Sequence, residues 1–341
     1  MQFDKFSLCK PTFLECPVSE LNFTAVLLNG QSFRFISWIL WKVLRSKEKC
    51  SKQKDFFIGV AFGRVWKLWR ENQKSIAFQV LHKFSSAVGD DKRVLEDYFQ
   101  LHVSLRDLYK IWSKCDPHFC QVVTSNLEVL SGIRILAQDV FETVISFICS
   151  SNNNIRRISK MVEELCKIYG ESVTFQQENM TFYDLPDLQK MADDEQLEIK
   201  LRANGFGYRS KYLQQAVRMI KELGGKKWLN SLALLPYETA KEKLEIIPGI
   251  GPKVADCICL MGLHMHRVVP VDTHVLQLTR ALYCPELMNK TNMNRATYSN
   301  ISTTWQNIFG DYAGWAQSVL FNAHLKHFEV GSNFKKRGKL V

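Results

Sequence analysis

The sequence lacks an apolar run long enough to cross a bilayer. Its most apolar short stretch, residues 35–44, is only half the roughly 20 residues that a membrane-spanning helix needs, and lysines and arginines follow it through Lys54. The N-terminus, Met1-Gln-Phe-Asp, carries no secretory signal, and Asp4 and Glu15 are poorly suited to a mitochondrial targeting helix. We therefore expect a chain without a membrane anchor.

The ten cysteines lack the even framework of a short secreted domain. We expect them to be reduced thiols, as in cytosolic and nuclear proteins. Acidic residues are fewer than basic ones, with 34 Asp and Glu against 45 Lys and Arg, so the formal net charge is +11. This excess favours a polyanionic partner, although many basic proteins bind no nucleic acid.

The length of 341 residues is enough for two or three compact parts, and no internal repeat is evident. Residues 20–82 have β-strand character. Two strands around an Asn29-Gly30 turn predict one hairpin, residues 56–70 predict a second around Gly63, and residues 76–82 predict a further strand.

From Val94 onward the apolar spacing is helical, interrupted by a polar break at residues 150–154 and a looser connection at 173–190. The pattern predicts an α+β fold, in which an N-terminal antiparallel sheet domain packs on an α-helical core. The expected boundaries are 1–135, 136–330 and a basic tail, 331–341. The clearest predicted helices cover residues 141–149, 155–169, 193–203, 209–223, 226–234, 237–247, 254–263, 271–283, 295–307 and 311–327.

The stretch Ile246-Ile-Pro-Gly-Ile-Gly-Pro-Lys-Val-Ala-Asp256 separates two predicted helices by two glycines and two prolines. These residues predict a tight hairpin with exposed backbone amides. The amides of Gly249, Ile250 and Gly251, next to a helix N-terminus, suit a phosphate oxygen. Such a contact involves backbone only and carries no base information. A plain corner between two helices is the alternative.

Lys253 stands at the mouth of the second helix of this hairpin. A helix N-terminus and apolar surroundings both disfavour an ammonium ion, so we expect its pKa to fall and its amine to be nucleophilic. Nineteen residues later, Asp272 follows an apolar stretch and a proline. It is expected to cap the next helix and to face Lys253. The alternatives are a surface lysine and a simple capping aspartate.

The chain resembles the helix-hairpin-helix DNA glycosylases, and closely the eukaryotic 8-oxoguanine DNA glycosylases. The resemblance rests on separate segments in the same order, which together are far more specific than the hairpin alone. These segments are Leu27-Leu-Asn-Gly-Gln-Ser-Phe-Arg34, Ser146-Phe-Ile-Cys-Ser-Ser-Asn-Asn-Asn154, Gly205-Phe-Gly-Tyr-Arg209, Ile247-Pro-Gly-Ile-Gly-Pro-Lys-Val-Ala-Asp-Cys257, Val269-Pro-Val-Asp-Thr-His274 and Tyr312-Ala-Gly-Trp-Ala-Gln-Ser-Val-Leu-Phe321.

The resemblance implies that Lys253 attacks C1′ of the damaged nucleotide and forms a Schiff base, and that Asp272 stabilises the positive charge that develops on the sugar. The imine makes the C2′ proton acidic, so β-elimination can nick the strand. The damaged base must leave the helical stack to be reached. Its implied pocket contains Gly30, whose carbonyl accepts the N7 hydrogen of 8-oxoguanine, together with Cys257, Gln317 and Phe321. By spacing alone, Gly30 is a turn residue and Phe321 a core residue.

The resemblance also implies the groups that hold the rest of the DNA. Asn152 fills the vacated space in the helix, and Tyr208 is a wedge at the neighbouring base pair. Arg157 and Arg209 hold the orphaned cytosine. The phosphate backbone of the DNA is contacted by His274 and by the hairpin residues Gly249, Gly251 and Val254. Without the resemblance, the asparagines would be interpreted as a solvated loop and a helix cap.

Two features depart from the family pattern. His324 stands where an acidic residue is common in the family. The segment of residues 36–54 is longer than expected at this hairpin. No cysteine follows Cys284, which argues against the four-cysteine iron–sulfur cluster of endonuclease III relatives. A zinc site is also not expected at Cys257, Cys259, His264 and His266, because side chains with this spacing on a helix would point to different sides. We expect neither a metal nor another cofactor.

The predicted function is therefore a bifunctional glycosylase and lyase that removes 8-oxoguanine opposite cytosine. The predicted partner is double-stranded DNA that contains this pair, and the protein is expected to be monomeric and nuclear, with Lys335-Lys-Arg-Gly-Lys339 as a candidate import signal. The alternatives are a glycosylase for another oxidised base and a non-catalytic DNA-binding module. A binding module would need neither Lys253 nor Asp272.

Overall fold

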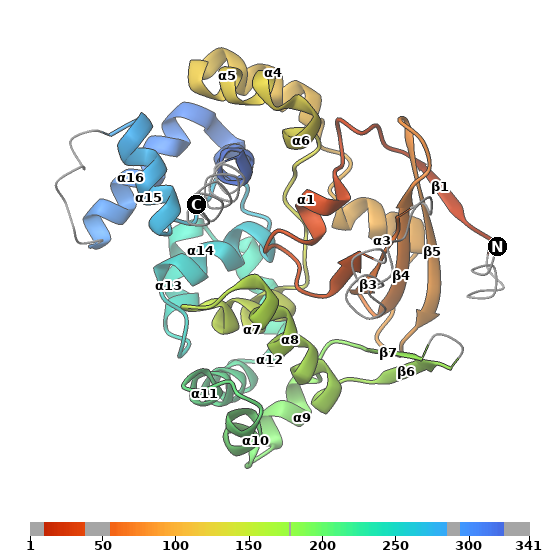
Figure 1. Ribbon diagram of the computed structural model, residues 1–341. Coiled ribbons are helices and arrows are strands. Elements are labelled where there is room, and N and C mark those ends of the chain that lie inside the picture. Colours follow the sequence, from red (N-terminus) through yellow and green to blue (C-terminus); the bar gives the residue numbers. More distant parts are fainter. Residues whose placement is uncertain (1–9, 38–54, 177–178, 285–293, 324–341) are drawn as a thin grey trace, which may run out of the picture.

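The computed structural model describes residues 10–37, 55–176, 179–284 and 294–323. A five-stranded antiparallel sheet forms one side of the molecule, and helices form the other (Figure 1). The strand order is β1-β5-β4-β3-β2. The strands are β1 (Thr12–Glu15), β2 (Phe35–Ser37), β3 (Phe57–Ala61), β4 (Arg64–Arg70) and β5 (Ser75–Lys83). The predicted antiparallel sheet and helical core are confirmed.

The sheet is covered on both faces by apolar side chains. On one face, α1 (Phe23–Leu27) and α3 (Asp91–Tyr98) pack against the buried Trp66 and Phe78. On the other face, Met180 and Phe182 join a second apolar cluster with residues of β3 and β4. The two clusters together keep water from both faces of the sheet.

The hairpin predicted around Asn29-Gly30 is wrong. Residues 23–27 form α1 instead, because Asn22 caps the helix by accepting a hydrogen bond from the Ala25 N–H at 3.1 Å. Only the end of the predicted second strand is extended, as β2, which pairs with β3. The hairpin of β3 and β4 and the strand β5 are confirmed.

Two strand pairs escaped prediction. β1 adds to the edge of the sheet beside β5. Within the predicted loose connection, β6 (Ser172–Phe175) and β7 (Met180–Tyr183) form an antiparallel hairpin. The apolar alternation in β6 and β7 is short, and their apolar side chains are buried against the five-stranded sheet, which is formed by a distant part of the chain. The local sequence pattern therefore did not reveal these strands.

The helical core is built around two helices that are buried along nearly their whole length, α7 (Val140–Ser150) and α14 (Pro252–Met261). The predicted polar break after α7 is confirmed, with Asn154 capping α8 (Ile155–Tyr169). The remaining helices are α4 (Leu105–Cys115), α5 (Pro117–Ser125), α6 (Leu127–Leu130), α9 (Leu188–Asp193), α10 (Leu197–Ala203), α11 (Arg209–Glu222), α12 (Gly225–Ser231), α13 (Tyr237–Glu245), α15 (Thr273–Leu282) and α16 (Arg295–Phe309).

Short 3-10 turns occur at Leu232–Leu234 and Gly310–Tyr312, and the chain is helical again from 313 to 323. The predicted helix at 193–203 begins four residues later than expected, as α10, and only Asp193 of that range belongs to α9. The other predicted helices from 209 to 309 agree with the structure to within a few residues. Among the described residues, no helix combines the length and the apolarity needed to cross a membrane.

Candidate active site

The hairpin between α13 and α14 brings Lys253 to the start of a buried helix. Gly249 has φ +89°, a left-handed conformation that glycine adopts without strain, and it packs against the Tyr212 side chain. Gly251 is the N-cap of α14, and Pro252 occupies the first turn, where its missing N–H costs nothing.

One part of the predicted phosphate cradle is wrong. The Ile250 N–H donates to the Ile247 carbonyl at 3.1 Å, so it closes the turn and does not face outward as a free donor. Gly251 is exposed, with open space where a side chain would stand. The positions of Gly249, Gly251 and Val254 at the mouth of α14 remain compatible with a backbone phosphate contact.

The Lys253 amine lies over the ring of Phe147, with Nζ 5.2 Å from the ring centre, and forms a hydrogen-bonding contact with Cys257 one turn along α14. Burial by itself lowers the pKa of Lys253. Cys257 and Asp272 act in the opposite direction, and together they outweigh burial, so the pKa of Lys253 lies above the ordinary lysine value. The predicted fall in pKa is therefore wrong in this structure, because burial was considered without its opposing charges.

Asp272 is the N-cap of α15, as predicted. One of its carboxylate oxygens accepts hydrogen bonds from the N–H groups of His274 and Val275, both at 2.9 Å. Its electrostatic effect on Lys253 is the interaction that the sequence predicted between the two side chains. The cap fixes the carboxylate in place, and half-burial reduces its screening by water, so its charge favours the ammonium form of Lys253.

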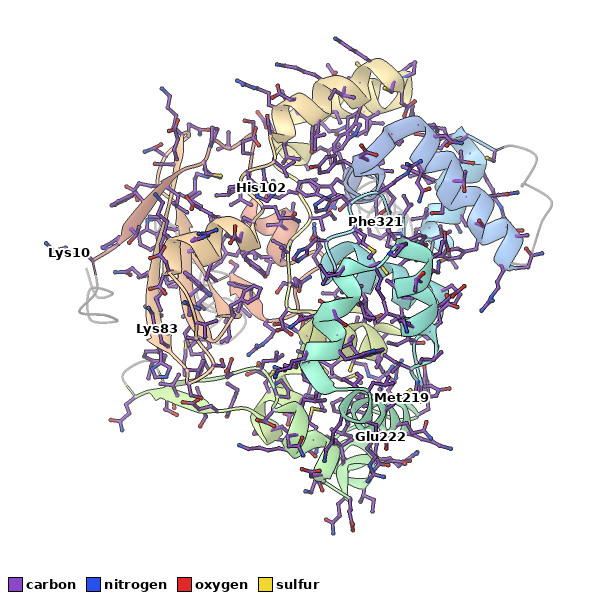
Figure 2. The ribbon with its side chains drawn as sticks, turned by 180° about the vertical axis from the view of Figure 1, so that it is seen from behind. Lys10, Lys83, His102, Met219, Glu222 and Phe321 are labelled. Atoms are coloured by element: carbon purple, nitrogen blue, oxygen red, sulfur yellow. The ribbon has the colours of Figure 1, made fainter. Side chains whose placement is uncertain are left out.

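The predicted base pocket draws residues from three distant segments. α14 supplies the buried Cys257, and the helix at 313–323 supplies the buried Gln317 and the half-buried Phe321. The Phe321 ring meets His274 edge to face, with centroids 6.0 Å apart. Figure 2 shows Phe321 near the middle of the view, whereas Lys10 lies at its edge.

Gly30 is tied to the same helix by its neighbour. The side-chain amide of Asn29 donates to the Asn322 side-chain oxygen at 2.7 Å, across 293 residues of sequence. Gly30 has φ +87°, and a side chain there would meet Ile155. The structure therefore brings the Asn29-Gly30 turn beside the helix that carries Gln317 and Phe321. This proximity is what the implied recognition of the base requires.

The loop after α7 and the start of α11 form a second group of predicted residues. Asn152 is exposed and has φ +47°, a left-handed conformation. The Arg209 guanidinium is buried, donates to the backbone carbonyls of Ser151 and Asn152, and lies 4.5 Å from the centre of the Tyr208 ring. Arg209 thus holds the loop that carries Asn152.

Arg157 is exposed, and its Nη2 donates to the Gly205 carbonyl at 3.0 Å. Tyr208 is 47% exposed, and its hydroxyl donates to the Ser151 carbonyl at 3.1 Å. These contacts join the loop of residues 151–154 to residues 205–209. The structure therefore gathers Asn152, Arg157, Tyr208 and Arg209 into one region, while their roles toward DNA remain predictions.

Two features near the site escaped prediction. Phe147, on α7, forms the apolar surface under the Lys253 amine. Asp256, on α14, is fully buried and accepts hydrogen bonds from two tyrosines. Both residues lie within the segments quoted for the resemblance, but neither a phenylalanine nor a buried aspartate announces its partners in the sequence.

A cleft of about 710 Å³ lies between α13 and α16, and none of the predicted site residues lines it. Among the described residues, no group of three or more histidine, cysteine or acidic side chains is arranged to hold a metal ion. His266 accepts a hydrogen bond from the Trp315 indole at 3.2 Å and stacks on Tyr312. Its surroundings are those of a packed side chain.

A helical hairpin that presents a lysine, followed by an aspartate at the next helix cap, defines the class of helix-hairpin-helix DNA glycosylases. Two family models match the chain: "8-oxoguanine DNA glycosylase, N-terminal domain" over residues 13–144, and "HhH-GPD superfamily base excision DNA repair protein" over residues 145–301. The chain belongs to the 8-oxoguanine DNA glycosylase family, and it is similar to proteins named N-glycosylase/DNA lyase.

The similarity to named relatives extends over most of the chain. The N-glycosylase/DNA lyase of Saccharomyces cerevisiae is 34% identical over 337 residues, which cover 90% of this chain and 84% of the yeast protein. The N-glycosylase/DNA lyase OGG1 of Arabidopsis thaliana is 37% identical over 236 residues, which cover 68% of this chain and 61% of the plant protein.

Solved structures with the same fold include the Clostridium acetobutylicum 8-oxoguanine glycosylase/lyase. Its apo form is 25% identical, with a TM-score of 0.71, and the match covers 92% of this chain and 96% of that one. Its complex with double-stranded DNA that contains cytosine opposite 8-oxoG is 26% identical, with a TM-score of 0.70, and covers 90% and 92% of the two chains. This protein is accordingly an enzyme of the DNA N-glycosylase and lyase class.

Proposed function

We propose that the protein excises 8-oxoguanine, mainly opposite cytosine, and then cuts the abasic strand through a Schiff base at Lys253. The observation that carries this proposal is the placement of the Lys253 amine on the apolar face of Phe147, with Cys257 and Asp272 as its polar neighbours. The Clostridium complex, which contains 8-oxoG opposite cytosine, supports the choice of substrate.

In the proposed reaction, the neutral Lys253 amine forms a bond to C1′ as the bond from C1′ to the base breaks. The base leaves with the electron pair, and opening of the sugar ring with loss of the amine proton yields the imine. Asp272 stabilises the positive charge on the sugar during this exchange. Removal of the C2′ proton then expels the 3′ phosphate oxygen. Because the pKa of Lys253 is raised, its ammonium must lose a proton before attack.

The DNA would bend over the region that carries Asn152, Arg157, Tyr208 and Arg209, with the extruded base between Cys257 and Phe321 and its edge at Gln317. The Gly30 carbonyl would accept the N7 hydrogen. His274 and the amides at the mouth of α14 would hold the phosphates. We propose further that the protein acts as a monomer in the nucleus. The tail that suggests nuclear import, like His324 and most of residues 36–54, lies outside the described residues.

The test is borohydride trapping on a duplex with 8-oxoguanine opposite cytosine, with wild type and Lys253→Gln in parallel. A trapped adduct only with the wild type is expected, because glutamine cannot form an imine. Base release by the wild type without any trapped adduct would mean that water attacks C1′ and that no Schiff base forms. Binding with neither release nor adduct would favour a non-catalytic module. Parallel duplexes with other oxidised bases, and with each base opposite the lesion, test the specificity.

A further inference from the structure

A buried polar network lies behind the proposed catalytic residues. Asp256 is 0% exposed, although it sits only three residues after Lys253 on α14. Burying a carboxylate is costly unless its oxygens are satisfied. Here the Tyr298 hydroxyl donates to Oδ2 at 2.6 Å, the Tyr237 hydroxyl donates to Oδ1 at 2.8 Å, and Lys241 forms an ion pair with Oδ1 at 2.9 Å. The carboxylate thus ties α14 to α13 and α16.

The two tyrosines differ in one respect. The Tyr298 hydroxyl also accepts a hydrogen bond from the backbone N–H of Val271 at 3.1 Å, whereas the hydroxyl of Tyr237 is bonded to Asp256 and Lys241. Val271 immediately precedes Asp272. Pro270 has no N–H with which to anchor this segment, so the Val271 N–H is a principal anchor for the backbone before the cap.

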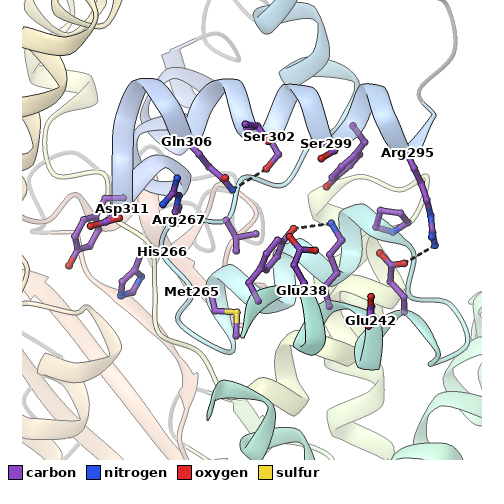
Figure 3. Close-up of a pocket in the computed structure, with 18 residues that line it drawn as sticks. Glu238, Glu242, Met265, His266, Arg267, Arg295, Ser299, Ser302, Gln306 and Asp311 are labelled. Atoms are coloured by element: carbon purple, nitrogen blue, oxygen red, sulfur yellow. Dashed lines mark hydrogen bonds and ion pairs between the residues drawn. The ribbon is translucent and has the colours of Figure 1, made fainter. Parts of the chain in front are cut away.

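The network opens onto the cleft of about 710 Å³, which is lined by Tyr237, Lys241 and Tyr298. Figure 3 shows this cleft between α16 and α13. The Lys241 amine donates to the Tyr237 hydroxyl at 3.0 Å. Burial raises the pKa of the Asp256 carboxyl, while Lys241 and the two tyrosines act in the opposite direction by favouring its charged form. The network therefore borders this cleft, which none of the proposed base-pocket residues lines.

We propose that Tyr298 is a positioning residue of the active site, whose hydroxyl joins Asp256 on α14 to the backbone before Asp272 and so sets the distance between Lys253 and Asp272. The two proposed catalytic side chains lie on different helices that are joined by the segment from 262 to 272. The Tyr298 hydroxyl oxygen is hydrogen-bonded both to Asp256 and to the Val271 N–H, so it directly restrains the distance between the two proposed catalytic side chains. This inference rests on the proposed function, because it concerns the same two side chains.

The test compares Tyr298→Phe with its matched control, Tyr237→Phe. Each substitution removes one hydroxyl from the same carboxylate and preserves the ring, but only Tyr298→Phe frees the Val271 N–H. The measurements are the single-turnover rate of base release at saturating enzyme, borohydride trapping, and the Kd for a duplex with a tetrahydrofuran abasic analogue. The rate is calculated per binding-competent molecule.

We expect Tyr298→Phe to slow base release and trapping together by roughly tenfold or more, because small misplacements of reacting groups are costly. The Kd should stay at the wild-type value. Tyr237→Phe should lose thermal stability but react at nearly the wild-type rate. A purely structural network would instead lower the stability of both variants and leave both rates unchanged, and equal rates in the two variants would overturn the positioning role.

Two further outcomes complete the test. If Tyr298→Phe does not yield folded protein, Asp256→Asn takes its place. That variant retains the Tyr298 hydroxyl but removes the charge that orients it, and the proposal expects slower base release here as well. An unchanged rate in that variant would also overturn the positioning role. Absence of base release by the wild type would overturn the proposed function itself, whereas normal release with equal rates in the variants overturns only the role of Tyr298.

Discussion

At the scale of single residues, the site depends on a few side chains whose local structural role and proposed chemical role coincide. Asp272 is the clearest case, because the carboxylate that caps α15 is also the charge that acts on Lys253. A structural role and a catalytic role on one residue are normally hard to separate. Here they separate, because asparagine caps helices about as well as aspartate does.

We predict that Asp272→Asn retains the stability of the wild type but slows base release by roughly a hundredfold, since the cap survives and the charge is lost. Asp272→Ala should slow release as well and also lose about 1 kcal/mol of stability with the cap. Single-turnover rates and urea unfolding measure the two effects. Asp187→Asn, at the exposed cap of α9, is the matched control and should leave the rate unchanged. A wild-type rate of base release in Asp272→Asn would show that the charge of Asp272 does not take part in the reaction.

At the scale of elements, the hairpin between α13 and α14 combines a packed glycine with an open one. A Cβ on Gly249 would lie 2.9 Å from the Tyr212 Cβ, and its φ of +89° strains any other residue. A Cβ on Gly251 would meet nothing within 4 Å, and its backbone is extended. The first glycine is required by packing, while the second leaves room outside the protein.

We predict that Gly249→Ala lowers the free energy of unfolding by about 1–3 kcal/mol, from backbone strain and the clash with Tyr212. Gly251→Ala should change stability by less than about 0.5 kcal/mol but weaken binding to duplex DNA, because its methyl group would stand where a phosphate approaches. Urea unfolding and DNA titration at fixed salt test this pair. Unchanged DNA affinity in Gly251→Ala would mean that the hairpin mouth does not contact the backbone.

At the scale of the whole molecule, the sheet and the helical core meet at buried charges. Glu142, on α7, is 6% exposed, and its Oε2 lies 3.9 Å from Nη1 of Arg34, which precedes β2. Burial raises the pKa of Glu142 to about 7. The nearby Arg34 and Lys226 oppose this rise, while Asp139 and Asp184 add to it. A glutamate with such a pKa makes the junction sensitive to neutral pH.

The sign of this sensitivity follows from the raised pKa. The stabilising contribution of protonated Glu142 is fully present below the ordinary glutamate pKa and is lost as pH rises through about 7. Glu142→Gln cannot ionise. We therefore predict that the wild type loses about 2–3 kcal/mol relative to Glu142→Gln between pH 4.5 and pH 8. Urea unfolding across this pH range measures the loss of stability. The control is Glu242→Gln, on the exposed face of α13, whose stability should depend on pH as that of the wild type does. Parallel curves for Glu142→Gln and wild type would contradict the assignment.

The sequence determined the elements whose signals are local. Helices α8, α11 and α14 and the hairpin of β3 and β4 follow from apolar periodicity and turn residues, and they lie close to their predicted bounds. The spacing of glycine, proline and lysine likewise placed Lys253 at a helix mouth. The capping role of Asp272 was predictable for the same reason, since a cap depends on residues within one helical turn.

Only the tertiary structure decided which distant residues share a surface. The hairpin expected at Asn29-Gly30 became a helix and a turn, and that turn meets Asn322 from the other end of the chain. The pKa of Lys253 rises because Asp272 and Cys257 surround it, and Tyr298 joins Asp256 to Val271 across 42 and 27 residues. Periodicity reports which face of an element is buried, but not which other element buries it, and these contacts depend on that choice.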